Sequence, residues 1–314
     1  MKELIYKGST KDIFHISGEE LCFKFTDRYS IFDYGEMPDQ ITNKGINTAK
    51  FTASIFKKFE QNLGIKTHLL KPGDSPDEII VKKFNVPRDF DSSVYYAKRP
   101  INSFIPLEVI FRFGVPVGSS LLKRGHQTGE KFSAPMIEFT TKLESIDRLI
   151  DYKEAQVISG LNDLEMEKLN IMATNLAYEL KNLIESKGLT LWDGKFEFAF
   201  GENLSSSERE IILVDSISLD EMRISYQDVP LSKEILRQIY KNDQWYGELE
   251  AAKKLDQNNF REKIPAPKHL NQKTISIVSE IYREVQSLIV AENHSTKYLD
   301  GLIKELKNEY HHLW

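Results

Sequence analysis

Residues 193–200 hold the side chains best suited to chemistry, in the order Asp-Gly-Lys-Phe-Glu-Phe-Ala-Phe. Successive side chains of a β-strand point to opposite faces, so Lys195 and Glu197 share one face of a strand over this segment. Asp193 joins them if the strand extends to its start. The three phenylalanines take the opposite face and anchor the strand in a core. The alternation therefore predicts an ammonium group and carboxylates held together on rigid backbone.

A second set of carboxylates follows the next predicted strand, which ends at Asp215. The segment continues with further polar and charged side chains, namely Ser216, Ser218, Asp220 and Arg223. Oxygen ligands of this kind suit Mg²⁺, which proteins commonly hold with one or two carboxylates and substrate phosphates. A solvated hairpin face with a surface ion pair is the alternative. Two such clusters on paired strands favour a functional site.

Small residues near the N-terminus form a candidate anion site. Residues 6–12 read Tyr-Lys-Gly-Ser-Thr-Lys-Asp and fall between two predicted strands. A turn at Gly8 and Ser9 would let backbone N–H groups approach a phosphate, and Lys11 would add positive charge. An ordinary hairpin turn is the alternative, because the segment lacks P-loop spacing and the chain has no GxGxxG motif.

Other charged segments are also candidates for binding a phosphate or a carboxylate. Arg112 falls on a predicted strand, and the glycine-containing turn after it supplies the hydroxyls of Ser119 and Ser120. Residues 26–33 and 43–47 are rich in charge, and the latter open a predicted helix, whose N-terminus favours anions. Capping and surface pairing are the alternatives. The seven histidines show no metal-ligand spacing, and no nucleophile elbow or kinase HRD or DFG motif occurs.

These segments depend on strands and one helix in the first hundred residues. Apolar side chains recur at spacings of three and four from Phe51 to Leu63, which predicts an amphipathic helix that stops at Gly64. Short strand-like runs separated by Gly, Asp and Pro predict an antiparallel sheet that packs against this helix. The predicted strands are 3–6, 12–16, 21–25, 79–84 and 93–97.

A second group of elements begins after Lys98-Arg99-Pro100, where we place a domain boundary. The predicted strands are 105–113, 195–200 and 210–215, the last two joined as a long hairpin. The predicted helices are 163–187 with a stop at Gly188, one around 278–289, and a last one from Ser295 or Thr296 to about Leu306. We therefore expect a sheet domain at 1–97, a second domain at 98–228 and a helical segment at 229–314.

Composition limits the classes of protein that the chain can represent. The 314 residues are 40% hydrophobic and 28% charged, an ordinary globular balance. The net charge of −5 argues against sequence-independent nucleic-acid binding. Apolar runs are far shorter than the roughly 20 residues needed to cross a bilayer, so we expect no membrane association. The single cysteine, Cys22, and the lack of a signal-like apolar segment after the first residues favour a cytoplasmic location.

Taken together, the candidate segments resemble the phosphoribosylaminoimidazole-succinocarboxamide synthase family, also called SAICAR synthetase. The resemblance rests on YKGSTKDI at 6–13, TDRYSIFD at 26–33, NKG at 43–45, IPLEVIFR at 105–112, DGKFEF at 193–198 and ILVDSISLD at 212–220. These stretches lie in the family's order and span roughly residues 4–225. No single motif is decisive, but the ordered set is specific.

The resemblance implies an α+β fold with an antiparallel-sheet ATP-binding domain, a second α+β domain and C-terminal helices. It also implies a reaction in which ATP, a carboxylated aminoimidazole ribonucleotide and L-aspartate give SAICAR, ADP and phosphate in purine biosynthesis. The implied cofactors are ATP and Mg²⁺, and the implied partners are these small molecules, with homo-oligomer formation left open.

By matching position, the resemblance implies a role for each candidate side chain. The ATP side is Gly8, Ser9, Lys11, Lys195, Glu197 and Asp215, and the metal-proximal carboxylates are Glu197 and Asp215. The nucleotide-substrate contacts are Arg112, Ser119, Ser120 and Arg223. The catalytic set is Asp193, Lys195 and Asp220, with the two aspartates facing the acceptor end of the cleft. Asp27, Arg28, Ser30 and Lys44 are assigned to the cleft in general.

Three positions depart from the family's pattern. Ser9 stands where many members have Lys, Ser216 where a Glu commonly follows the strand-end Asp, and Leu219 where a Pro is usual. Loss of the acid at residue 216 would affect metal binding or the choice of amine. Two alternatives follow, namely a divergent ATP-dependent amide ligase with a different amine or carboxylate, and a nucleotide-binding homologue without ligase activity.

Overall fold

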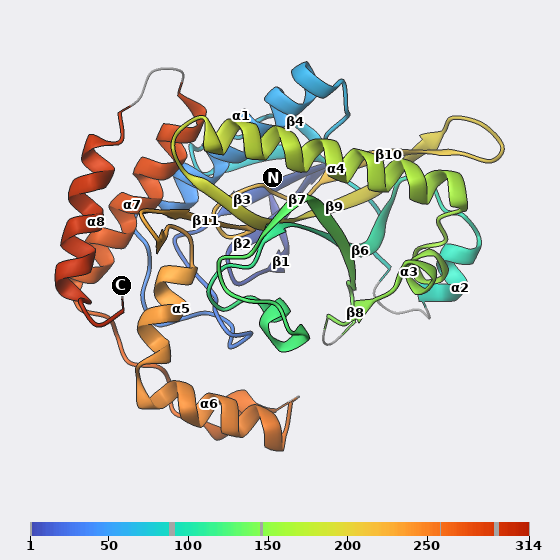
Figure 1. Cartoon of the computed structure of the whole chain (residues 1–314). Helices are drawn as coiled ribbons and strands as arrows, with labels where there is room; N and C mark the ends of the chain where they lie inside the picture. Colours follow the sequence, from blue (N-terminus) through green and yellow to red (C-terminus); the bar gives the residue numbers. More distant parts are fainter. Residues whose placement is uncertain (1, 88–91, 145–146, 258, 292–294, 314) are drawn as a thin grey trace.

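A computed structural model describes residues 2–87, 92–144, 147–257, 259–291 and 295–313 of the chain. It contains two antiparallel sheets, a long helix against each of them, and a group of C-terminal helices (Figure 1). This arrangement confirms the expected α+β class. The division into parts at residues 97 and 228 remains a prediction.

The first sheet has five strands in the order β1-β2-β3-β5-β4. Their bounds are Glu3–Lys7 (β1), Lys11–Ser17 (β2), Glu20–Phe25 (β3), Leu69–Pro72 (β4) and Glu78–Lys82 (β5). Four of these were expected from the sequence, and β4 was not. Helix α1 (Lys44–Leu63) packs against the sheet through its apolar face and ends at Gly64, whose φ of 65° matches the predicted stop.

The strand predicted at 93–97 is wrong, because these residues belong to the short helix α2 (Ser92–Ala97). Tyr96 is fully buried there and donates its hydroxyl hydrogen to the carbonyl of Phe104 at 2.5 Å. A short apolar run is compatible with either a buried strand or a buried helix. Tertiary packing determines which of the two forms here, and the run is too short for its periodicity to distinguish them.

The second sheet has seven strands in the order β12-β11-β9-β6-β7-β8, with β10 also paired to β9. Their bounds are Ser103–Gly114 (β6), Lys131–Thr141 (β7), Leu149–Ile150 (β8), Thr190–Asn203 (β9), Arg209–Val214 (β10), Met222–Tyr226 (β11) and Val229–Pro230 (β12). The predicted strand at 105–113 and the predicted hairpin are confirmed as β6 and as β9–β10. In the hairpin register, Val214 pairs with Glu197.

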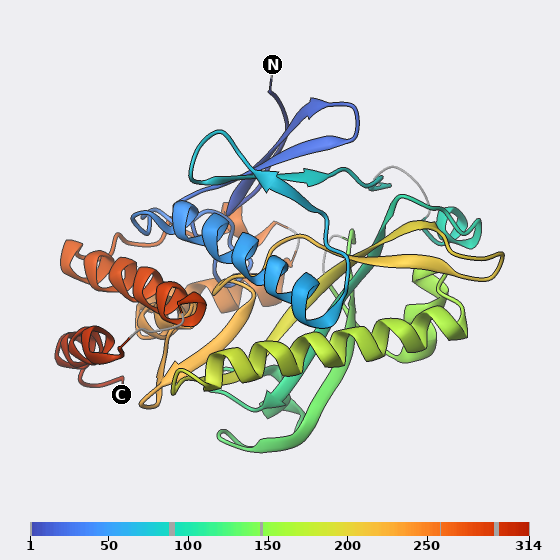
Figure 2. The same ribbon diagram turned by 90° about the horizontal axis from the view of Figure 1, so that it is seen from above.

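Helices cover the second sheet and close one end of the molecule (Figures 1 and 2). Their bounds are Tyr152–Ser159 (α3), Asp163–Glu185 (α4), Glu234–Lys241 (α5), Gln244–Leu255 (α6), Gln272–Val290 (α7) and Lys297–Glu309 (α8), with 3₁₀ turns at Ser120–Arg124 (η1) and Phe260–Lys263 (η2). The predictions for α4, α7 and α8 are confirmed. Among the helices of the described residues, none combines the length and apolar character needed to cross a bilayer.

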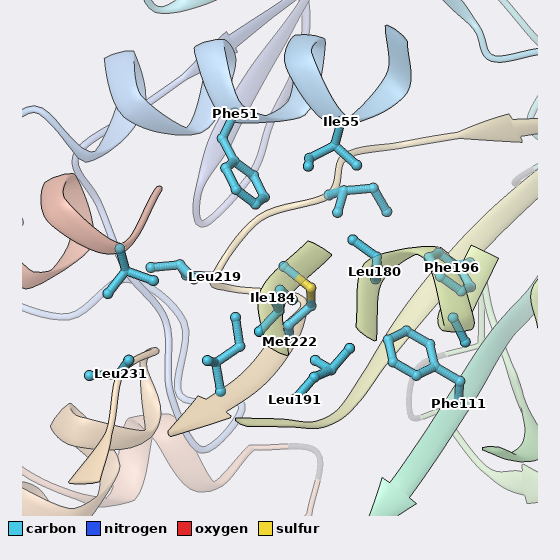
Figure 3. Close-up of a cluster of buried hydrophobic side chains, with 14 of the residues drawn as sticks. Phe51, Ile55, Phe111, Leu180, Ile184, Leu191, Phe196, Leu219, Met222 and Leu231 are labelled. Carbon is cyan, nitrogen blue, oxygen red and sulfur yellow. The ribbon is translucent and has the colours of Figure 1, made fainter. Parts of the chain in front are cut away.

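A continuous apolar core joins the second sheet to α4 and to α1, and side chains of all three meet in it (Figure 3). Phe111 of β6 and Phe196 of β9 stack with ring centroids 4.9 Å apart, and both side chains are buried. Gly194 permits this approach, because a Cβ atom there would lie 2.6 Å from Cζ of Phe111. The core side of β9 is therefore rigid, and the side chains of its other face are held in fixed positions.

Candidate functional site

Residues of both sheets line one cavity of about 880 Å³. The turn between β1 and β2, strands β6 and β9, and the segment between β10 and β11 all contribute to it. One part of the lining is apolar and comes from Ile13, Leu21, Phe23, Phe84, Val86, Phe104 and Val214. The other part carries a dense set of charged side chains, which includes nearly every candidate residue named from the sequence.

The predicted polar face of β9 opens into this cavity. Lys195 Nζ lies 3.1 Å from Oε1 of Glu197, and both side chains line the cavity, whereas Phe196, Phe198 and Phe200 are buried on the opposite face. Two further residues complete the cluster. Glu108 of β6 pairs with Lys195, and Lys142 lies 2.7 Å from Glu108 and 3.3 Å from Glu197. Two ammonium groups and two carboxylates therefore alternate at one point of the wall.

The charges of this cluster stabilise one another. Burial raises the pKa of Glu108, but the positive charges of Lys195 and Lys142 outweigh burial and lower that pKa to about 2. Burial lowers the pKa of Lys195, but the negative charges of Glu197 and Glu108 bring it well above its usual value. Near neutral pH, Glu108 is therefore ionised and Lys195 carries a positive charge.

Asp215 follows the end of β10 and has a left-handed backbone, with φ of 67°. Its side chain pairs with Lys11, and its carbonyl lies 2.9 Å from Nε2 of the buried His68. A non-glycine residue with this φ is uncommon and is held in place by its surroundings. Burial raises the pKa of Asp215, but Lys11 and then Lys195 lower it to about 2, so the carboxylate is ionised.

Asp193 forms the centre of an arginine-rich part of the wall. Arg112 lies 3.2 Å from Asp193, and Arg223 also pairs with it through both Nε and a terminal nitrogen. Arg112 in addition donates to Ser120 at 3.4 Å. Asp193 thus orients both guanidinium groups, and Glu138 also holds Arg112, with 2.6 Å between its carboxylate and Nε. Guanidinium groups fixed at a cavity wall are a suitable arrangement for binding an anion.

The predicted turn at Gly8 forms and lines the cavity together with Ser9 and Lys11. The N–H of Gly8 donates to the carbonyl of Lys11 at 2.9 Å, and a Cβ atom at Gly8 would lie 2.7 Å from that carbonyl. Only glycine fits this close approach. Ser119 does not line the cavity, and its hydroxyl instead accepts from the N–H of Leu121 at the start of η1.

Asp220 reaches the cavity next to the C-terminal helices. Its carboxylate lies 2.8 Å from Nζ of the buried Lys44 and accepts from the hydroxyl of Tyr282 at 3.1 Å. Asp27 instead accepts from the backbone N–H groups of Asn43 and Gly45, so it organises the start of α1.

The remaining members of the general set divide between the cavity and the fold. Ser30 lines the cavity. Arg28 pairs with Asp12 and donates to the carbonyl of Gly8 at 2.9 Å. Arg28 therefore stabilises the turn at Gly8 by this hydrogen bond and does not itself line the cavity.

The donor set fits a magnesium ion held jointly by protein and substrate. Glu197 lies on β9 and pairs with Val214, the last residue of β10, and Asp215 directly follows Val214. Among the described residues, no group of three or more His, Cys, Asp or Glu side chains could hold a metal by itself. Two carboxylates match the usual Mg²⁺ arrangement, in which substrate phosphates and water complete the coordination.

Sequence reasoning missed seven charged residues of the cavity wall. They are Lys82, Glu108, Lys142, Asp147, Glu221, Lys233 and Arg237. Glu108 lies within the IPLEVIFR stretch, but most of its strand is apolar and shows no alternation of polar and apolar residues. Its position opposite Glu197 follows from the register of β6 and β9, which the sequence does not reveal.

Two of the departures from the family's pattern do not reach the cavity. Leu219 is fully buried in the apolar core, where Figure 3 shows it, and Ser216 is also buried. Neither side chain lines the cavity, whereas Ser9 does. The changes at residues 216 and 219 therefore do not alter which side chains line the cavity.

Comparisons with known proteins point to a single family. The model of the SAICAR synthetase family matches residues 4–254. A phosphoribosylaminoimidazole-succinocarboxamide synthase of Thermoplasma volcanium is 32% identical over 304 residues, covering 90% of this chain and 96% of that protein. The synthase of the same name from Thermoplasma acidophilum is 33% identical over 275 residues, covering 80% and 87%.

Solved structures agree with the sequence relatives. A type-2 SAICAR synthetase in complex with ADP superimposes with a TM-score of 0.61 at 26% identity. The match covers 84% of this chain and 99% of that one. The fold and the family therefore agree over most of the chain.

Proposed function

The chain belongs to the SAICAR synthetase family, and we propose that its cavity joins L-aspartate to carboxyaminoimidazole ribonucleotide at the expense of ATP. The products are SAICAR, ADP and phosphate, in de novo purine biosynthesis. The observation that carries this proposal is the convergence of Lys195, Glu197 and Asp215 beside the turn at Gly8 in one cavity. A cytoplasmic location is part of the proposal, supported by Cys22, which is buried and free.

The reaction needs an activated carboxyl group, because a free carboxylate resists attack by an amine. A carboxylate oxygen of the nucleotide attacks the γ-phosphorus of ATP, and ADP leaves. The ammonium group of aspartate loses one proton to water, and the resulting amine attacks the carbonyl carbon of the acyl phosphate. Phosphate leaves, and the nitrogen loses a second proton to give the amide. Positioning the three substrates and stabilising the transferred phosphoryl group supply most of the acceleration.

The ATP phosphates are proposed to lie between the Gly8 turn and β9. Lys11 and Lys195 supply positive charge there from opposite sides of the cavity, and both ammonium groups are oriented by carboxylates. The apolar part of the lining, which includes Phe84 and Phe104, suits a purine ring. The adenosine end of ATP therefore has an apolar site and the phosphate end a cationic one.

Glu197 and Asp215 are the proposed magnesium ligands. When bound, Mg²⁺ would neutralise charge on the phosphate oxygens of ATP. Asp215 is ionised at neutral pH, as a ligand must be, because Lys11 lowers its pKa against the effect of burial. Lys11 and Lys195 compensate the carboxylate charge when no cation is bound.

The nucleotide substrate is proposed to bind at the arginine-rich part of the wall. Arg112 and Arg223 present guanidinium groups that Asp193 holds in place, and Ser120 adds a hydroxyl. Guanidinium groups match the geometry of a phosphate or carboxylate. Asp193 and Asp220 would then act at the acceptor side by orienting cations, since each is already paired with one.

Release of ADP tests the function. The purified protein is incubated with ATP, Mg²⁺ and carboxyaminoimidazole ribonucleotide, with and without L-aspartate, and ADP and SAICAR are measured. Turnover that requires every component is expected. Turnover only with another amine would instead indicate a divergent ligase, and ATP binding without turnover for any amine would indicate a homologue without ligase activity.

A further inference from the structure

Most charged side chains of the cavity wall have a partner of opposite charge, and a few do not. Among the described residues that line the cavity, those without an ion-pair partner are Lys82, Asp147, Glu221 and Lys233. Lys82 lies over the ring of Phe84 on the first sheet, and Asp147 lies in the loop after β7. Glu221 and Lys233 differ from these, because they flank the two paired strands β11 and β12.

The β11–β12 hairpin brings Glu221 and Lys233 close together. Ser225 pairs with Pro230, and the N–H of Leu231 donates to the carbonyl of Ile224 at 2.8 Å. Glu221 directly precedes β11, and Lys233 lies just after β12 at the start of α5, so the two residues flank the open end of the hairpin. The electrostatic interaction between the two groups agrees with this placement, although they are too far apart to form an ion pair.

Glu221 is held firmly at its position. Its carboxylate accepts from the hydroxyl of Ser218, and its N–H donates to the carbonyl of Ser218 at 3.1 Å. Its own carbonyl accepts from the N–H of Lys195 at 3.1 Å. The backbone of Glu221 is thereby joined to the residue that lies at the centre of the phosphate site.

An unpaired carboxylate and an unpaired ammonium group on adjacent segments match the charges of a free amino acid. We propose that Glu221 and Lys233 bind the L-aspartate substrate as a zwitterion, with Glu221 accepting hydrogen bonds from its ammonium group and Lys233 donating to a carboxylate. This inference rests on the proposed function and assigns the site of its amine substrate. It places the amine substrate on a segment whose backbone is hydrogen-bonded to that of Lys195.

The protonation behaviour of both groups agrees with this assignment. Burial, and then the charge of Asp220, raises the pKa of Glu221. Burial, and then the charge of Arg237, lowers the pKa of Lys233 to about 8. Each group thus lacks a nearby opposite charge that would compensate it fully. A zwitterion bound between them supplies both missing charges.

The variant Glu221→Gln tests the ammonium contact. We expect the KM for L-aspartate to rise about 10- to 100-fold, because one charge-assisted hydrogen bond is lost. The KM values for ATP and for the nucleotide should stay within about 2-fold of wild type. Glu167→Gln on the exposed face of α4 is the matched control, since it removes the same charge away from the cavity. Unchanged thermal melting shows that the variants are folded.

Succinate separates the two contacts, because it keeps both carboxylates of aspartate and lacks the ammonium group. Glu221→Gln should weaken aspartate but leave inhibition by succinate intact. Lys233→Met should weaken both. An unchanged KM for aspartate in Glu221→Gln would overturn this inference and leave the proposed function intact. A Lys233→Met variant that changes only the KM for the nucleotide would do the same. Wild-type protein that makes no product from L-aspartate would overturn the proposed function and this inference with it.

Discussion

The two ends of the β9–β10 hairpin carry the same kinds of charge and differ in what surrounds them. At the start of β10, Arg209 and Glu165 form an ion pair in which neither side chain is exposed. The guanidinium of Arg209 also donates to the carbonyls of Pro100 and Gly160, and it lies 3.4 Å above the ring of Phe200. At the other end, Lys195 and its partners face a cavity.

The difference separates a structural ion pair from a functional cluster. Arg209 and Glu165 satisfy their hydrogen-bonding capacity within the fold, so they have no capacity left for a ligand. Lys195 and Lys142 share two carboxylates at a surface that a substrate can reach. Burial and charge alone therefore do not identify a site in this protein, but charge beside an open volume does.

Removing one member of the closed pair should have the largest effect. Glu165→Gln leaves Arg209 buried without its counter-charge, so we expect the free energy of unfolding to fall by about 3–5 kcal/mol. Urea unfolding measures this change. Glu185→Gln is the control, because it removes a charge from the exposed last turn of the same helix. A loss below about 1 kcal/mol would show that the pair is not structural.

The cavity cluster should respond in the opposite way. Lys195→Met is expected to lower kcat about 100- to 1000-fold, because positive charge aimed at the transferred phosphoryl group is lost. Its melting temperature should stay near that of wild type, since Lys142 still lies within ion-pair distance of both Glu108 and Glu197. Steady-state ADP release and thermal melting give both values. A variant that is destabilised but keeps its turnover per folded molecule would show that Lys195 serves the fold and not the reaction.

Much of this contrast was visible in the sequence, and the remainder depended on tertiary pairing. Alternation along residues 195–200 predicted correctly which side chains of β9 face the core and which face away. The sequence could not show that Glu108 pairs with Lys195, because the contact joins positions 87 residues apart through the register of two strands. It also could not show that Lys44 meets Asp220 across the molecule.

Element type was predictable where a periodic pattern was long. Helix α4 has several apolar turns and clear end signals, and it was predicted to within two residues at each end. The run at 93–97 is too short to show a period, and its burial against β6 made it helical. The distinction between Arg209 and Lys195 was also hidden, since both are basic residues on strands and only the cavity separates them.

Acid should weaken the open cluster by neutralising its carboxylates. The pKa of Glu108 is about 2 in the folded protein and ordinarily 4.5, so its contribution is fully present above pH 4.5 and is lost as the pH falls through 2. Between pH 5 and 2.5, the difference in unfolding free energy between wild type and Glu108→Gln should therefore shrink by about 2 kcal/mol. Urea titrations at both pH values measure it. A constant difference would contradict the assigned pairing.

The smallest effect is expected for an exposed cluster of the same composition. Arg148 pairs with Glu144 and Glu154, and all three side chains are at least 40% exposed. Arg148→Ala should change the free energy of unfolding by less than about 1 kcal/mol, because solvent screens exposed pairs. Urea unfolding at low and high salt provides the measurement. A larger loss would mean that burial does not determine how much the Arg209, Lys195 and Arg148 clusters each contribute to stability.

The most direct test of the account compares two glutamates of the same strand. Glu197 lies in the cavity, and Glu202 lies at the exposed end of β9, where it accepts from Asn102 at 2.8 Å. The measurement is ADP release with ATP, Mg²⁺, carboxyaminoimidazole ribonucleotide and L-aspartate for Glu197→Gln and Glu202→Gln. The account predicts that Glu197→Gln remains folded and loses turnover at least about 100-fold, while Glu202→Gln keeps wild-type turnover. Wild-type turnover in Glu197→Gln would contradict it.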